Sequence, residues 1–460
     1  YSLSNPSQFL SQRSLDRRTK QGIALKDNDI PVNPSYVDSV RSKGAKVINR
    51  SKWLNSVTID ADSTQVEEIK KLPFVLNSVK IGKRLSVIKA ENKLSENLQP
   101  GEAKSNSNRI AASQAFDYGK AQKQIEMLNG IPLHNEGFRG EGMLIAILDA
   151  GFRRVDTLPA FDSLWVNNQI LGTWDFVTGD SSVFEDDTHG MHVLSTMGGN
   201  LPGSIIGTAP KAQYILLRSE NANFGYEYEV EECHWAAAAE YADSAGADII
   251  NSSLGYTTWE DESLTPDHTY DDLDGNTAIA TIAADIAASK GILVVNSAGN
   301  EGASLWHYIG VPADGDSVLA IGAVRDDRVR TGFSSYGLGS VSFKNEVKPN
   351  VMSMGQSCAI QETNGTISNN GTGTSFAGPI LAGMAACLWQ ANPTKTNMNV
   401  FRAIEKSADK YNSPDSSYGY GIPDFQKARD IVLGIKTFTL NKNQVLAYPN
   451  PFSEKGLSVD

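Results

Sequence analysis

Three short segments of this 460-residue chain place an acid, a histidine and a serine where such side chains can perform chemistry. Asp149 ends an apolar run, His189 enters a predicted helix, and Ser375 follows a glycine-rich turn that opens another helix. A serine hydroxyl is a good nucleophile only when a base removes its proton, and the base needs an acid that fixes its tautomer and stabilises its charge. These residue types therefore indicate acyl transfer through a serine nucleophile.

The three segments follow one another in a characteristic order. They read ILDAG at 147–151, THGMHV at 188–193 and GTGTSFAGP at 371–379. In this order they resemble the motifs of subtilisin-like serine peptidases, the S8 family. The resemblance extends over about residues 110–435. It implies that the catalytic residues are Asp149, His189 and Ser375.

Two further segments carry the same resemblance. In SAGN, at 297–300, Asn300 matches the family's side-chain donor to the oxyanion, which acts together with the backbone N–H of the serine. In IINSSLG, at 249–255, the strand end matches the edge that pairs with an extended peptide substrate. The substrate-binding residues implied by the resemblance are Ser253, Leu254, Gly255, Ala298 and Gly299.

Three positions depart from the family pattern. Ala150 stands where Ser or Thr usually follows the acid, Met191 replaces the usual Thr, and Phe376 begins a variant of the segment after the serine. None of these changes removes a group that performs a chemical step. We therefore expect a secreted serine endopeptidase. The alternatives are an inactive scaffold that serves in binding or adhesion and, less well supported, an ester or amide hydrolase of small molecules.

Each residue also has a simpler interpretation when taken alone. Asp149 can cap a strand end, Ser375 can be a plain helix N-cap, and Asn300 can belong to a turn. These interpretations lose weight because the residues occur together. His192 lies three residues after His189, but no third-ligand pattern accompanies the pair, so we interpret it as a packed neighbour and not as a metal ligand.

No cofactor is required by these motifs. The acidic run 260–274, with Asp271, Asp272 and Asp274, can supply oxygen ligands to Ca²⁺, but it lacks EF-hand spacing and is better interpreted as a solvated loop. Tyr256 and Trp259 near this insertion either line the cleft or anchor the loop. The three cysteines form no CxxC pair, and buried free thiols are the preferred interpretation of Cys233 and Cys387.

The elements that must position these residues alternate between strand and helix. Continuous apolar runs separated by Ala-rich helices predict an α/β fold, a doubly wound and mostly parallel sheet with helices on both faces. The predicted strands lie near 143–150, 213–219, 247–255, 291–300, 318–324 and 348–352. The predicted helices cover 231–245, 277–289 and 375–390.

A smaller α/β unit precedes this domain. Residues 35–90 predict a helical turn, a β region at 47–59, a helix with a capping box at Thr64 and Glu67, and a strand at 74–79. The unit resembles the inhibitory prosegment that precedes many subtilisin-like domains. The chain divides into a prosegment at 1–95, a linker at 96–108, a catalytic domain at 109–435 and a truncated β domain at 436–460.

The last of these segments contains LAYPNPF at 446–452, which resembles the start of sorting domains on proteins exported by bacterial type IX secretion. This resemblance implies a protein outside the cell or on its surface. Because prosegment and catalytic domain stand on one chain, an unprocessed precursor is expected, in which the prosegment is a partner of the catalytic domain alongside polypeptide substrates.

Charge is distributed unevenly along the chain. Residues 1–100 hold 17 Lys+Arg and 10 Asp+Glu, whereas residues 151–300 hold 5 and 23. An acidic main body disfavours nucleic acid and anionic lipid as partners, and a basic N-terminal segment can dock on it. The longest apolar run has roughly ten residues, and a membrane span needs about 20. We therefore expect no membrane span.

Overall fold

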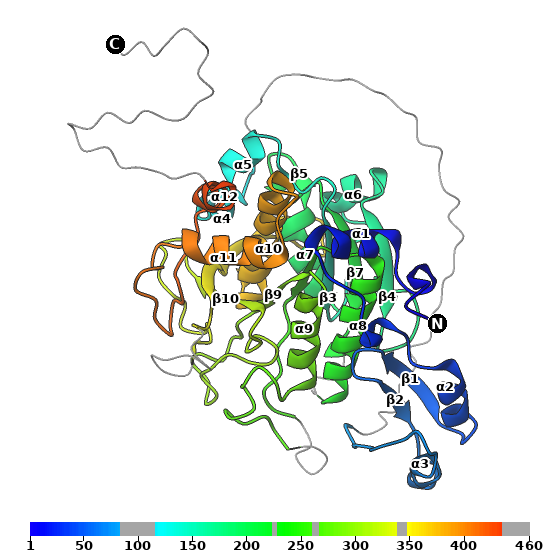
Figure 1. The fold of residues 1–460 in the computed structure, drawn as a ribbon. Coiled ribbons are helices and arrows are strands. Elements are labelled where there is room, and N and C mark those ends of the chain that lie inside the picture. The colour runs from blue at the N-terminus through cyan, green and yellow to red at the C-terminus, as the bar shows by residue number, and fades with distance from the viewer. Residues whose placement is uncertain (83–115, 223–227, 260–265, 338–346, 435–460) are drawn as a thin grey trace, which may run out of the picture.

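A computed structural model describes residues 1–82, 116–222, 228–259, 266–337 and 347–434 (Figure 1). The predicted linker at 96–108 and the predicted β domain at 436–460 lie outside the described residues. Among the described residues, no helix is long and apolar enough to cross a membrane.

A seven-stranded parallel sheet organises the larger domain. Its spatial order is β11-β10-β9-β8-β3-β7-β4. The strands are β3 (Leu144–Asp149), β4 (Ile170–Asp175), β7 (Gln213–Arg218), β8 (Ile249–Ser252), β9 (Leu293–Ser297), β10 (Val318–Val324) and β11 (Val351–Met354). All the predicted strands of this domain are present. The edge strand β4 was not predicted, because its residues are mostly half-buried and show no continuous apolar run.

Helices cover both faces of this sheet, which confirms the doubly wound α/β prediction. Alternate residues of β3 face opposite sides, so Ile145 and Ile147 join one core while Ala146 and Leu148 join the other. Figure 1 shows α8 and α9 side by side on one face. The long helices are α7 (His189–Gly198), α8 (Val230–Ala245), α9 (Ile279–Ser289), α10 (Thr374–Ala391), α11 (Asn397–Ser407) and α12 (Phe425–Leu433).

Short elements complete the larger domain. The polar insertion after β11 is an antiparallel hairpin of β12 and β13. The bounds of the short elements are α4 (Gln122–Glu126), α5 (Ile131–Asn135), η3 (Pro159–Phe161), α6 (Asp162–Val166), β5 (Asn200–Leu201), β6 (Ile205–Ile206), β12 (Gln356–Gln361) and β13 (Ile367–Thr372).

The smaller N-terminal unit packs on α8. Its elements are α2 (Pro34–Arg41), β1 (Lys46–Ser51), β2 (Ser56–Asp60) and α3 (Ser63–Lys70). The side chain of Trp53 is buried and joins the apolar cluster to which α8, α9 and the sheet contribute. A capping box is present, but it is formed by Asp62 and Gln65, each two residues before the predicted Thr64 and Glu67. The predicted strand at 74–79 is wrong: Phe74 and Val75 pack on the small core of this unit, but the segment forms no strand and Leu76 is 96% exposed.

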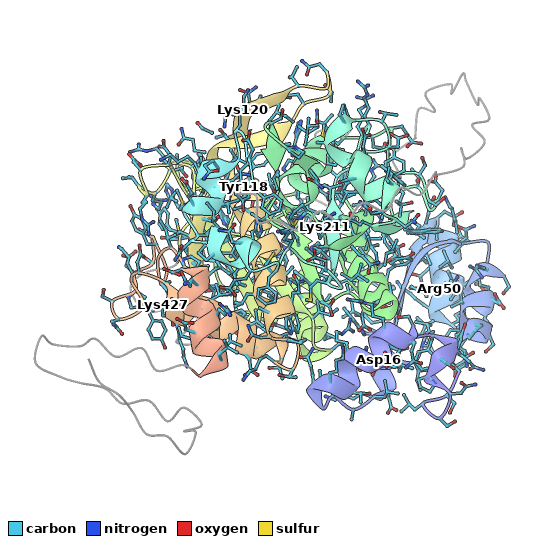
Figure 2. All side chains as sticks on the ribbon, turned by 90° about the horizontal axis from the view of Figure 1, so that it is seen from above. Asp16, Arg50, Tyr118, Lys120, Lys211 and Lys427 are labelled. Atoms are coloured by element: carbon cyan, nitrogen blue, oxygen red, sulfur yellow. The ribbon has the colours of Figure 1, made fainter. Side chains whose placement is uncertain are left out.

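A helical arm precedes that unit. It contains η1 (Pro6–Gln8), α1 (Gln12–Gln21) and η2 (Asp27–Asp29). We refer to residues 1–30 as the arm. Figure 2 shows Asp16 on α1 and Arg50 on β1 on the same side of the molecule, away from Lys120.

Candidate active site

Asp149 and His189 form a hydrogen-bonded pair at the carboxyl edge of the sheet. Asp149 is the last residue of β3 and is fully buried. Its Oδ1 accepts from the N–H of Ala150 at 2.8 Å and lies 2.8 Å from Nδ1 of His189. Because a carboxylate can only accept, Nδ1 carries the hydrogen and Nε2 is left to act as a base.

His189 is held as the first residue of α7. Its backbone N–H donates to the carboxylate of Asp187 at 2.7 Å, and its side chain remains 32% exposed. Burial lowers the pKa of His189, but the charge and hydrogen bond of Asp149, with further help from Glu220 and Asp187, outweigh burial and raise the pKa to about 9. The imidazole is thus a stronger base than a free histidine.

The second carboxylate oxygen of Asp149 has no hydrogen-bond partner among the described residues. The family pattern places a hydroxyl directly after the acid, and this chain has Ala150 there. The missing hydroxyl therefore coincides with an unpaired buried oxygen.

Ser375 lies in the first turn of α10, where the positive end of the helix favours developing negative charge. Gly373, two residues before the serine, has φ +145°, a backbone conformation that side-chain-bearing residues rarely adopt. The Oγ of Ser375 donates to the carbonyl of Ser253 at 3.4 Å. Within the described residues it makes no hydrogen bond to His189.

Asn300 is oriented by the residue that precedes the serine. Its Oδ1 accepts from the backbone N–H of Thr374 at 2.9 Å and from the Thr374 hydroxyl at 3.1 Å. Because both donors fix the oxygen end of the amide, the Nδ2 group keeps its two hydrogens for another acceptor. Asn300 lines the same cleft as Ser375, which suits it to stabilise an oxyanion.

One cleft of about 390 Å³ brings most of the predicted site residues together. It is lined by His189, Ser253, Leu254, Gly255, Gly299, Asn300 and Ser375. Asp149 stands behind His189 and does not line the cleft. Ala298 does not line it either: its side chain is fully buried, its N–H donates to Ile321 and its carbonyl accepts from Gly310. Ala298 therefore supports the cleft wall from behind.

Three carboxylates in the cleft were not predicted from the sequence. Asp187, Glu220 and Glu301 also line it. Asp187 lies two residues before His189, and Glu301 directly follows Asn300. Their closeness in sequence to predicted site residues was a signal that could have identified both. Glu220 follows β7, the neighbour of β3 in the sheet, so only the strand order places it beside Asp149.

The remaining predicted features lie outside this cleft. Tyr256 and Trp259 are buried and stacked with ring centres 5.9 Å apart, so they anchor their loop. His192 has its Nε2 3.8 Å from a carboxylate oxygen of Glu362. All three cysteines are free thiols, and burial raises the pKa of Cys233 to about 12.

Possible metal ligands do not cluster among the residues that the structure describes. Within the ranges described, no group of three or more His, Cys, Asp or Glu side chains could hold a metal ion. In the acidic insertion, Asp272 accepts from the backbone and hydroxyl of Thr269, and Asp274 accepts from the N–H of Asn276.

Comparison with known proteins identifies two matching family models. The model described as "Subtilase family" matches residues 140–421, and the model described as "Peptidase S8 propeptide domain, Bacteroidota" matches residues 1–99.

Individual relatives agree with these matches. Subtilisin NAT of Bacillus subtilis subsp. natto is 28% identical over 395 residues, 85% of each chain. Subtilisin of Bacillus pumilus is 30% identical over 321 residues, which are 69% of this chain and 99% of that one. A solved protease structure from Pseudoalteromonas arctica PAMC 21717 shares the fold with a TM-score of 0.51 at 20% identity, over 69% of this chain and 100% of that chain. The chain therefore belongs to the subtilase family of serine peptidases and carries the family's propeptide at its N-terminus.

Proposed function

We propose that this chain is the precursor of a serine endopeptidase that uses Ser375, His189 and Asp149 as its catalytic triad. The observation that carries the proposal is the position of His189. Its Nδ1 is held by the buried Asp149 at 2.8 Å, and its ring lines the cleft that also contains Ser375 and Asn300.

The first half of the reaction forms an acyl-enzyme. The Oγ of Ser375 turns away from the Ser253 carbonyl and attacks the scissile carbonyl carbon, while its proton passes to Nε2 of His189. The oxyanion accepts from Nδ2 of Asn300 and from the Ser375 N–H. The carbon–nitrogen bond then breaks, and His189 gives its proton to the leaving amine.

The second half restores the enzyme. His189 removes a proton from water, and the resulting hydroxide attacks the ester carbon of the acyl-enzyme. The ester bond breaks, Ser375 recovers its proton from His189, and the carboxylate product leaves. Throughout both halves, Asp149 remains an anion that stabilises the imidazolium.

We infer polypeptide substrates from the shape and charge of the cleft. Ser253, Leu254 and Gly255 line it directly after β8, where an extended peptide can pair with the backbone as an added strand. The carboxylates of Asp187, Glu220 and Glu301 favour cationic side chains near the scissile bond.

A secreted or cell-surface location goes with this proposal. A peptidase made together with its own propeptide is suited to release outside the cell that makes it. The sorting-domain resemblance at 446–452 supports the same location but falls outside the described residues. Cell fractionation with an antibody to residues 140–421 tests it: the protein is expected in the medium or on the surface, and retention in the cytoplasm contradicts it.

Labelling with a fluorophosphonate tests the catalytic proposal. The full chain is labelled before and after trypsin digestion that cleaves within 96–108 and degrades the propeptide, and the labelled peptide is mapped. We expect label on Ser375, no label in Ser375→Ala, and full label in Ser413→Ala, which alters an exposed serine. Label only after cleavage indicates that the propeptide blocks the cleft. Absence of label from folded protein in both states favours the inactive binding scaffold.

A further inference from the structure

The arm contacts the larger domain at the amino-terminal ends of the sheet strands, whereas the cleft lies at their carboxyl ends. Arg13 donates to the carbonyl of Gly142 at 2.7 Å and pairs with Asp248, and these residues lie just before β3 and β8. Asp149 lies at the other end of β3. Six strand residues at about 3.3 Å each separate the two edges by roughly 20 Å, so the arm cannot itself fill the cleft.

The arm donates hydrogen bonds to the free backbone carbonyls at the C-terminal end of α8. The carbonyl of Ala245 accepts from the Ser11 hydroxyl at 2.9 Å, and the carbonyl of Gly246 accepts from Nε of Arg13 at 3.0 Å. Arg17 donates to the carbonyls of Ala247 and Lys290. The last turn of α8 holds no basic residue, so the arm supplies the positive charge that this helix C-terminus favours, whereas α9 has Lys290 as its C-cap.

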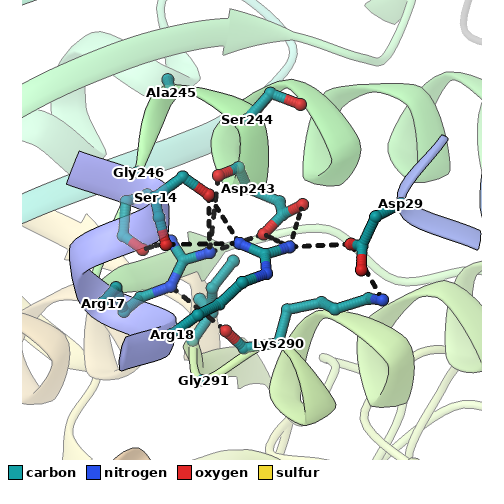
Figure 3. Close-up of polar contacts among 12 residues, drawn as sticks. Ser14, Arg17, Arg18, Asp29, Asp243, Ser244, Ala245, Gly246, Lys290 and Gly291 are labelled. Carbon is teal, nitrogen blue, oxygen red and sulfur yellow. Dashed lines mark hydrogen bonds and ion pairs between the residues drawn. The ribbon is translucent and has the colours of Figure 1, made fainter. Parts of the chain in front are cut away.

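A buried charge cluster lies beneath these contacts (Figure 3). Asp243 in the last turn of α8 is fully buried and pairs with Arg17 and Arg18 of the arm. Arg18 also pairs with Asp29 at 2.9 Å, and Asp29 pairs with Lys290 at 2.9 Å. Burial raises the pKa of Asp243, but the charges of Arg17, Lys52 and Arg18 outweigh burial and lower it.

The cations that form ion pairs with Asp243 therefore come from the propeptide, while Lys290 of the peptidase domain pairs with Asp29 instead. Arg17, Arg18 and Lys52 all precede residue 99. A buried carboxylate costs free energy unless it is paired, so this surface of the peptidase domain is specific for a cationic partner.

The backbone of this surface is shaped for close contact. Gly246 and Gly291 follow α8 and α9 and have positive φ values of +94° and +90°. A Cβ on Gly246 would lie 2.7 Å from Arg13, and a Cβ on Gly291 would lie 2.7 Å from Gln21. Both glycines thus let the arm approach the helix ends.

We propose that the C-terminal ends of α8 and α9 form an exosite for a helix with arginines at positions i, i+4 and i+5, which in this chain are Arg13, Arg17 and Arg18. The inference deepens the proposed function, on which it rests, by assigning a second contact for the propeptide. The α/β unit binds α8 through further contacts of its own, made by Ser51, the backbone of Lys52 and Trp53. It also reaches the exosite through the Lys52 ammonium, which pairs with Asp243.

Two linked contacts hold a fragment more tightly than either alone, because release of one leaves the other at high effective concentration. The exosite therefore keeps the propeptide bound after the chain between propeptide and peptidase domain has been cut. Mature activity then requires removal of the arm as well as the cut.

The test follows release of the propeptide from the full chain. Ser375→Ala protein carries a dye at residue 1 and an inserted site for a sequence-specific protease after residue 100. After the cut and dilution, fluorescence anisotropy reports dissociation. We expect Arg17→Gln with Arg18→Gln to raise the dissociation rate at least 100-fold. The matched control Arg41→Gln, which alters an exposed arginine paired within α2, should leave it unchanged.

A change below threefold in the double variant, with the protein folded by circular dichroism, overturns the exosite. A second variant covers the case in which the double variant does not fold. It keeps every side chain and instead adds a protease site between residues 32 and 33, which separates the arm from the α/β unit. The fragment 33–100, carrying its own dye, should then leave at least tenfold faster, and an unchanged rate overturns the proposal.

These measurements use Ser375→Ala protein and need no peptidase activity. Fluorophosphonate labelling of the unsubstituted chain reports the proposed function separately. Label on Ser375 with no effect of the arginine substitutions rejects only the exosite. Arginine-dependent release without label rejects only the catalytic proposal.

Discussion

The Nδ1 atom of His189 lies 2.8 Å from Oδ1 of Asp149, with the carboxylate fully buried and the imidazole open to the cleft. This pairing fixes the tautomer of His189 and raises its pKa to about 9. The same pairing therefore determines both the direction of proton transfer and the pH range in which His189 is a free base.

We predict alkaline activity from this pKa. The imidazole must be neutral to accept the proton of Ser375, so kcat/KM of the processed enzyme should rise about tenfold per pH unit below 9 and level off above it. Measurement of kcat/KM from pH 5 to 11 with a neutral fluorogenic peptide checks this. A plateau that begins near pH 7 contradicts it.

The stability of the folded chain should change in the opposite direction. Because the pKa of His189 is raised in the folded state, its contribution is fully present below the ordinary value of 6.5. It is lost as the pH rises through about 9. The neutral imidazole, which the proposed mechanism needs as a base, is therefore the form of His189 that pairs less strongly with Asp149.

Glu220→Gln should move the pH profile toward acid. The charge of Glu220 helps raise the pKa of His189, so its removal should lower the midpoint by roughly half a unit or more. Activity at neutral pH then increases if substrate binding is unchanged. Asp326→Asn, which alters an exposed carboxylate, is the control and should leave the midpoint in place. A midpoint unchanged by Glu220→Gln shows that this carboxylate does not act on His189.

Asn300→Asp separates two functions of one side chain. An aspartate keeps the oxygen that accepts from Thr374 but has no donor for the oxyanion. We expect kcat to fall by about 10²–10³ with little change in KM, the usual effect of losing one oxyanion donor. The exposed Asn369→Asp should have no effect. A matching fall in thermal stability would instead indicate a structural role for Asn300.

Glu301→Gln should weaken selection for cationic peptides. Glu301 lines the cleft next to Asn300. At low salt its carboxylate attracts the Lys and Arg side chains of a substrate. The ratio of kcat/KM for paired peptides with Arg or Ala near the scissile bond should exceed one and fall several-fold in the variant. Added salt should reduce the ratio as well. Equal ratios in both proteins at low salt exclude electrostatic selection by this residue.

The proposed catalytic residues could be named from the sequence because each lies in a short contiguous motif. The central strands were predictable for a related reason: parallel strands buried on both faces appear as continuous apolar runs, as at 144–149. The segment at 74–79, which forms no strand, shows the limit of this logic, since β-forming residues need a partner strand that local sequence does not reveal.

The arm shows the same limit for charged residues. Arg17 and Arg18 look like solvated side chains in sequence, yet both are buried because they meet Asp243, more than 200 residues away. Likewise, Glu220 enters the cleft only through the order of strands in the sheet. Long-range pairing of this kind leaves no periodic signal along the chain.

Glu240→Gln should weaken docking of the α/β unit. The carboxylate of Glu240 accepts from the Ser51 hydroxyl and from the backbone N–H groups of Lys52 and Trp53. A glutamine offers one acceptor oxygen, so a buried donor loses its partner at a cost of about 1–3 kcal/mol. Urea unfolding of the full Ser375→Ala chain measures the loss. The exposed Glu67→Gln should change stability little, and equal stabilities of the two variants contradict the expected role.

Gly383→Ala tests the packing that holds α10 and therefore Ser375. A Cβ at Gly383 would lie 2.0 Å from the Thr208 hydroxyl oxygen, with no room for the two to coexist, whereas a Cβ at Gly332 would meet nothing within 4 Å. Overpacking in a core typically costs about 1–3 kcal/mol, so Gly383→Ala should lower the free energy of unfolding by that amount. Gly332→Ala, where the added methyl meets no neighbour, should stay within about 0.5 kcal/mol of the unsubstituted chain. Because α10 carries Ser375 in its first turn, fluorophosphonate labelling should slow together with the loss of stability. Normal stability of Gly383→Ala would show that α10 can shift away from Thr208 without cost.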